Sequence, residues 1–177
     1  MTDETVEIRQ KGPYHYTYAE THGPVARVKP GQRVRIHCVD CFADKAVDES
    51  QPFEEICRFP RTNPQTGPVY VEGAEPADTL RVHIEDIEIT RDWAVTGLVP
   101  GFGLLTGTAT TAMLTPELPE VHRRLPIHDG RVWFGRFSRP LQPFMGSLGT
   151  APSLEAVNSL TPSCTGPPTF GSVHSRV

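Results

Sequence analysis

Residues 63–89 read NPQTGPVYVEGAEPADTLRVHIEDIEI, and this stretch carries the strongest prediction of the fold. Two apolar runs of strand-like composition, PVYVEG and LRVHIEDIEI, stand on either side of the short connector GAEPAD. Gly73 gives that connector backbone freedom, whereas Pro76 fixes one φ angle. The stretch therefore predicts two strands joined by a hairpin-like or Greek-key corner.

The second run, residues 80–89, alternates apolar and polar side chains as far as Ile84. Beyond Ile84 the alternation shifts by one residue, so that the last two isoleucines fall on the other parity. A β-bulge inserts one extra residue into a strand and produces such a shift. The pattern predicts a strand with a bulge near Glu85 and Asp86.

An earlier stretch, VARVKPGQRVRIHCVD (residues 25–40), predicts two more strands around a Pro-Gly turn. Pro30 suits the first central position of a type II turn, and Gly31 suits the positive φ of the next. In the second strand apolar and polar residues alternate from Arg33 to Cys38. If this alternation continues, Asp40 points inward, where a carboxylate must be paired, hydrogen-bonded or bound to a cation.

The composition of the whole chain supports a mainly β fold. The 177 residues include 18 prolines and 15 glycines, which interrupt the sequence at short intervals and disfavour long helices. We expect a β-sandwich or barrel-like domain of short strands, with one short helix around residues 52–57. The sequence GRVWFGRF (130–137) predicts a further strand, and HRRLPIHD (122–129) is typical of a surface loop.

Charge and hydropathy exclude several classes of protein. The formal net charge is −4 with a pI near 6.0, which gives no electrostatic basis for binding nucleic acid. No apolar run is long enough to span a bilayer, and the polar N-terminus MTDETVEIRQ lacks the apolar core of a signal peptide. We therefore expect a cytoplasmic protein that binds neither nucleic acid nor membrane.

Three motifs, in order along the chain, carry a family resemblance. The stretch 63–89 resembles the T-G-P…G-A-E-P-G-D-x-L signature of the acetamidase/formamidase family. VKPGQRVRIHCVDC (28–41) resembles an earlier strand pair of that family, and RPLQPFMGSLGTAPS (139–153) is similar to its P-F-x-G-x-x-G-x-A-P loop. One departure is Ala77, where the family has glycine; alanine is tolerable there unless the backbone needs φ > 0.

The resemblance implies a β-rich, homo-oligomeric enzyme that hydrolyses short aliphatic amides, such as formamide or acetamide, to a carboxylate and ammonia. It also implies metal-assisted catalysis with a divalent ion, zinc being one candidate. No G-x-S-x-G motif supports a serine nucleophile, and Cys41 lacks an identifiable base. Attack by a metal-activated water is therefore the leading chemistry that we predict for the small amide substrate.

The end of the chain departs from the family. Family members continue after the A-P loop with a His-Gly-Gly motif, whereas this sequence reads LTPSCTGPPTFGSVHSRV and stops. Codons for Ser163 to Gly166 can be chosen so that the frame one base earlier reads Leu-His-Gly. We expect a domain at 1–162 and a foreign tail at 163–177, produced by a frameshift after Pro162. A chain shortened in this way should be poorly active, with an unpartnered apolar surface around 144–148.

Asp40 and Glu75 are the predicted catalytic residues and metal ligands. The alternative for Asp40 is an acid that caps a turn by accepting backbone N–H groups, and for Glu75 an ordinary solvated acid. Glu72 and Asp78 fit structural roles better, because aspartate in a turn hydrogen-bonds its own backbone. The histidines offer no zinc signature, since no H-x-x-x-H or H-E-x-x-H occurs.

Two other classes of function stay open at the level of sequence. A non-catalytic β-rich binding module would need only the predicted core and its loops. A redox or zinc role for Cys38 and Cys41, which form the C-x-x-C of CVDC, lacks a second cysteine pair to complete a zinc site. His128 beside Asp129 could orient an imidazole ring, although a solvated loop is the simpler interpretation.

Overall fold

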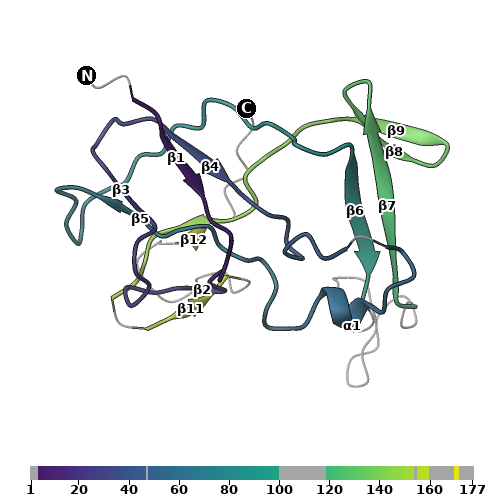
Figure 1. The fold of residues 1–177 in the computed structure, drawn as a ribbon, viewed down its shortest axis with the longest axis horizontal. Coiled ribbons are helices and arrows are strands. Elements are labelled where there is room, and N and C mark those ends of the chain that lie inside the picture. The colour runs from purple at the N-terminus through teal and green to yellow at the C-terminus, as the bar shows by residue number, and fades with distance from the viewer. Residues whose placement is uncertain (1–3, 47, 100–118, 154, 160–169, 172–177) are drawn as a thin grey trace. The chain divides into compact units, whose positions relative to one another are not determined.

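The computed structural model describes residues 4–46, 48–99, 119–153, 155–159 and 170–171 (Figure 1). These residues form two compact units. Unit 1 comprises Met1–Asp44, Cys57–Ile87 and Phe144–Val177, and unit 2 comprises Lys45–Ile56 and Glu88–Pro143. The elements are β1 Val6–Arg9, β2 Thr17–Tyr18, β3 Ala26–Val28, β4 Val34–His37, α1 Phe53–Ile56, β5 Val69–Val71, β6 Trp93–Leu98, β7 Val121–His128, β8 Arg131–Phe134, β9 Phe137–Pro140, β10 Leu148–Gly149, β11 Val157–Asn158 and β12 Phe170–Gly171.

Unit 1 consists of short paired strands. β1 pairs with β4 and β3 with β5, both in parallel, while β2–β11 and β10–β12 are antiparallel pairs. The predicted turn between β3 and β4 is present: Gln32 N donates to Lys29 O at 3.0 Å, and Gly31 has φ 78°. The two strands that flank this turn pair with other strands and not with each other, which the local sequence could not show.

Unit 2 is built on an antiparallel sheet of four strands in the order β6-β7-β8-β9 (Figure 1). The two-residue loop after β7 has positive φ at both Asp129 and Gly130, the geometry of a type I′ hairpin turn. The next loop has positive φ at Gly135 alone, as in a type II′ turn. These twisted turns match the right-handed twist of the strands, so the predicted strand at 130–137 is a hairpin of β8 and β9.

The buried core of the described residues is small. In unit 1 the apolar side chains below a tenth exposed are Ile8, Ala19, Val28 and Cys57, and in unit 2 they are Ala46, Phe53 and Ile56. The helix α1 confirms the predicted helix around residues 52–57 and buries both its first and last residue. The mainly β fold class is confirmed, with the strands divided among small sheets.

Three local predictions are wrong. Residues 80–89 form no strand, so neither the predicted corner nor the bulge at Glu85 and Asp86 exists. The predicted surface loop at 122–129 is instead most of β7. β4 ends at His37, so the alternation does not reach Asp40, and Cys38 is exposed where an inward position was predicted.

The described part of the chain contains no helix that is long and apolar enough to cross a membrane.

Candidate functional site

The acidic turn follows β5 directly. Glu72 N donates to Val28 O at 2.8 Å, which continues the parallel β3–β5 pairing to the first residue of the turn. Glu75 and Asp78 then close the turn on each other: Glu75 N donates to Asp78 Oδ2 at 2.9 Å, and Asp78 N donates to Glu75 O at 3.1 Å. Asp78 thus has the local, backbone-bonded position that its sequence predicts.

This arrangement fixes the backbone of Glu75 and leaves its side chain exposed. Ala77, two residues later, has φ 79°. The left-handed region costs an L-residue with a Cβ roughly 1–2 kcal/mol relative to glycine. The backbone at this position therefore needs a positive φ, and alanine is unfavourable where the family has glycine.

Asp40 belongs to a second turn. Its Oδ1 accepts hydrogen bonds from Phe42 N and Asp44 N, both at 2.9 Å. Ala43 and Asp44 have φ 56° and 58°, so the carboxylate stabilises a turn whose last two residues are left-handed. This geometry is that of an acid capping a turn, and the half-buried Asp40 is not the inward-pointing strand residue that parity predicted.

Parts of all three resemblance motifs lie close together within unit 1. Asn63 N donates to Cys41 O at 3.0 Å, and Thr66 Oγ1 donates to His37 O at 3.4 Å, so the second motif runs beside the end of the first. Tyr18 joins the second motif to the third: its hydroxyl donates to Gln65 Oε1 at 2.7 Å and is also hydrogen-bonded by the Ser147 side chain.

Burial raises the pKa of the Tyr18 hydroxyl, and the hydrogen bond from Ser147 works against that rise. Tyr18 therefore stays protonated at neutral pH and donates to Gln65. No sequence pattern singles out this tyrosine, because its role depends on partners that are up to 129 positions away in the chain (18 to 147).

The described residues do not by themselves complete a metal site. No group of three or more His, Cys, Asp or Glu side chains among them could hold a metal ion. No hydrogen bond or ion pair between described residues joins Asp40 to Glu75, and Asp40 Oδ1 is engaged by two backbone amides. The two predicted ligands therefore lie on separate turns of unit 1, whose described residues supply too few donors for a closed zinc site.

The cysteines and the other histidines fit structural or solvent positions. Cys38 and Cys41 are exposed, and Cys57 is buried. His128 Nδ1 is 2.8 Å from Asp129 Oδ2, and both side chains are exposed at the hairpin loop. His37 Nε2 is 2.8 Å from Glu7 Oε1; this bond and one from Arg9 lower the pKa of the Glu7 carboxyl.

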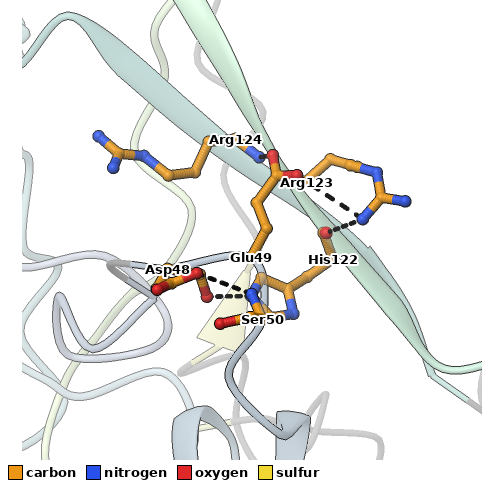
Figure 2. A network of polar contacts seen from close by, with 6 residues as sticks. All are labelled: Asp48, Glu49, Ser50, His122, Arg123 and Arg124. Carbon is orange, nitrogen blue, oxygen red and sulfur yellow. Dashed lines mark hydrogen bonds and ion pairs between the residues drawn. The ribbon is translucent and has the colours of Figure 1, made fainter.

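A polar network holds the loop before α1 against β7 in unit 2 (Figure 2). His122 is 4% exposed and its Nε2 lies 2.8 Å from Asp48 O. Arg124 N donates to Glu49 Oε1 at 2.6 Å, and Ser50 N donates to Asp48 Oδ1 at 2.8 Å. The Ser50 hydrogen bonds lower the pKa of the Asp48 carboxyl.

This network binds mainly backbone atoms, which makes it a clamp for the loop and not a catalytic cluster. The sequence analysis missed this network because its hydrogen bonds join residues 74 and 75 positions apart, and because it predicted a solvated loop at His122.

Comparison with known proteins identifies the class to which this arrangement of motifs belongs. The acetamidase/formamidase family matches residues 2–163, and the chain belongs to that family. A search of the curated proteins finds no significant match.

Solved structures of bacterial acetamidases are similar to this chain. An acetamidase from Bacillus halodurans matches with a TM-score of 0.78 and 29% identity, over 98% of this chain and 53% of its own. An acetamidase from Yersinia enterocolitica matches with a TM-score of 0.75 and 29% identity, over 95% and 52%. A predicted acetamidase/formamidase from Thermoanaerobacter tengcongensis matches with a TM-score of 0.70 and 25% identity, over 89% and 48%. The chain spans about half the length of these proteins.

Proposed function

We propose that this chain forms part of an amidohydrolase that converts short aliphatic amides, such as formamide and acetamide, to a carboxylate and ammonia. The observation that carries the proposal is the family match over residues 2–163. The hydrogen bonds from Asn63 and Thr66 to the first motif support it, as do those that link Gln65 and Ser147 through Tyr18. Residues distant in sequence then contribute to one region of unit 1.

Glu75 is the proposed proton acceptor. Its side chain is exposed and its backbone is held by Asp78, so a water molecule can reach the carboxylate without rearrangement of the turn. In the proposed reaction the water oxygen attacks the amide carbonyl carbon and its proton passes to Glu75. The carbon–nitrogen bond then breaks, and the nitrogen leaves as ammonia after taking up a proton.

Asp40 is the second proposed site residue. Its two backbone hydrogen bonds fix one oxygen and the orientation of the carboxylate plane, which suits an electrostatic or orienting role. A divalent metal ion, with zinc as one candidate, stays part of the proposal. Because the described residues supply too few donors, any such ion would need further ligands from outside them; when bound, it would polarise the amide carbonyl.

We further propose that the active form is longer than this chain and homo-oligomeric. The acetamidases of known structure are about twice as long as the region they share with this chain. The 177-residue chain alone should therefore show little or no turnover.

The test is ammonia release from formamide and acetamide. The 177-residue chain is compared with a version continued after Pro162 in the alternative reading frame, before and after treatment with a chelator. The proposal predicts release by the longer version, loss on chelation and recovery on addition of Zn²⁺ or another divalent ion. Release by neither version would reject amide hydrolysis and favour a non-catalytic binding module. Ammonia release that a chelator does not affect would reject only the metal ion and leave amide hydrolysis in place.

A further inference from the structure

Residues 80–87 of unit 1 have the composition of a buried strand without being one. Leu80 and Val82 are 51% and 49% exposed, and their neighbours Arg81 and His83 are exposed as well. Between described residues, no β-ladder and no backbone-to-backbone hydrogen bond involves this segment. Its interactions are an ion pair between Glu85 and Arg33 at 2.8 Å and a local bond from Ile87 N to an aspartate.

A segment of this kind is costly to leave uncovered. Alternating apolar side chains with free backbone N–H and C=O groups are a template for another strand, and soluble proteins ordinarily pair, cover or charge such an edge. Here the charged residues of the segment are Arg81, Glu85 and Asp86, and Leu80 and Val82 stay about half exposed beside them. Unit 1 has few buried apolar side chains among its described residues. Its own core is therefore too small to cover the apolar side chains of this segment.

The relatives contain additional chain that is available to cover it. The Bacillus halodurans acetamidase aligns with 98% of this chain at a TM-score of 0.78, yet 47% of that protein (100 − 53) has no counterpart here. Parallel in-register pairing with a second copy of this chain would instead bring Glu85 and Asp86 beside the same carboxylates, which is destabilising.

We propose that residues 80–87 are a docking edge for a β-strand supplied by the part of the family fold that has no counterpart in this chain. The strand adds to the free backbone edge of the segment, and its apolar face covers Leu80 and Val82. This inference concerns assembly of the fold and does not depend on amide hydrolysis. The two can therefore fail independently.

Amide hydrogen exchange tests the proposal on proteins as they exist. The 177-residue chain and the intact Bacillus halodurans acetamidase are compared at the aligned segment, with the oligomeric state measured by light scattering in the same buffer. The proposal predicts rapid exchange at residues 81–87 in the 177-residue chain and protection at least about 100-fold greater in the acetamidase.

Each of the other outcomes of the exchange experiment would overturn the proposed docking edge. Protection in a monomeric 177-residue chain would mean that the segment finds a partner within the chain. Protection that appears only in an oligomer of this chain would assign the edge to a second copy. Rapid exchange in both proteins would mean that nothing docks there.

A pair of substitutions in the intact acetamidase gives a second readout. Lysine at the position aligned with Val82 should lower the melting temperature, because it places a charge in a covered face, whereas lysine at the position aligned with His83 should leave it nearly unchanged. Equal effects at the two positions would contradict the docking edge.

Discussion

Two regions have the opposite structure from the one that their sequences predict. Residues 80–89 were predicted as a strand and form none, whereas most of β7, Val121–His128, was predicted as a loop. The first has alternating Leu, Val and Ile and forms no strand. The second contains two arginines and Pro126, and it is the longest strand among the described residues. The difference lies in their partners: β7 lies between β6 and β8, whereas no described strand pairs with residues 80–89.

Pro126 shows how β7 tolerates a residue that usually breaks strands. Ile127 N donates to Asp92 O on the β6 side at 2.7 Å, so the nitrogen of Pro126 faces the other way. On that side the ladder with β8 stops at Ile127, opposite Val132. The missing N–H of proline therefore costs no ladder hydrogen bond.

The first prediction tests what holds β7 in place. Replacing His122 with alanine removes a buried ring and its contact with Asp48 O, and should cost about 2–4 kcal/mol in the free energy of unfolding. The matched change His128→Ala, at an exposed position of the same strand, should cost less, about 0.5–1 kcal/mol, because it removes only the contacts of an exposed ring with Asp129 and Trp133. Urea denaturation measures both. Similar losses in the two variants would show that the clamp in Figure 2 contributes nothing to β7.

The second prediction compares the two regions directly. Lysine at the half-buried Ile127 should destabilise the chain by about 1–3 kcal/mol, because a charge enters the paired sheet. Lysine at the exposed Val82 should change the free energy of unfolding by less than about 0.5 kcal/mol and should raise solubility. Denaturation and light scattering together give both values. A large loss of stability in Val82→Lys would mean that residue 82 is already packed.

The third prediction concerns the turn that leads into the unpaired segment. Ala77→Gly should raise the free energy of unfolding by about 1 kcal/mol, because glycine adopts φ 79° without strain. Ala74→Gly in the same turn, where φ is not positive, should lower stability by about 0.5–1 kcal/mol. Thermal denaturation distinguishes the two, and a destabilising Ala77→Gly would contradict the left-handed conformation.

The smallest predicted effect is a dependence on pH from the clamp. The pKa of Asp48 is lowered in the folded chain by its hydrogen bonds to Ser50. The unfolded chain therefore binds the proton at higher pH, so this contribution is present above the ordinary aspartate range, about pH 4. It is lost as the pH falls through the folded-state pKa. Asp48→Asn should show a shallower loss of stability below about pH 4 than the unchanged chain. Parallel profiles would exclude the contribution.

The sequence predicted the features that depend on neighbouring residues. Gly31, Asp78 and the short helix all occupy their expected conformations, because a turn or a cap is decided within a few positions. The mainly β fold class was predictable because prolines and glycines interrupt the sequence at short intervals and disfavour long helices.

The features that the sequence missed depend on distant partners. The parallel pairing of β3 with β5 and the burial of His122 both require residues more than 40 positions away. The inward strand orientation predicted for Asp40 was wrong for a different reason. The carboxylate of Asp40 caps the turn of residues 40–44, and the strand ends at His37, before it reaches the aspartate.

The central proposal is that the acidic turn serves amide hydrolysis as well as the fold. The most direct measurement is kcat/KM for formamide in the longer version of the protein, with Glu75→Gln compared with Glu72→Gln after both variants are shown to be equally stable. Removal of the proposed proton acceptor should lower kcat/KM at least about 100-fold in Glu75→Gln, with less than about a threefold change in Glu72→Gln. Equal activity in the two variants would contradict the claim and leave the acidic turn with a structural role.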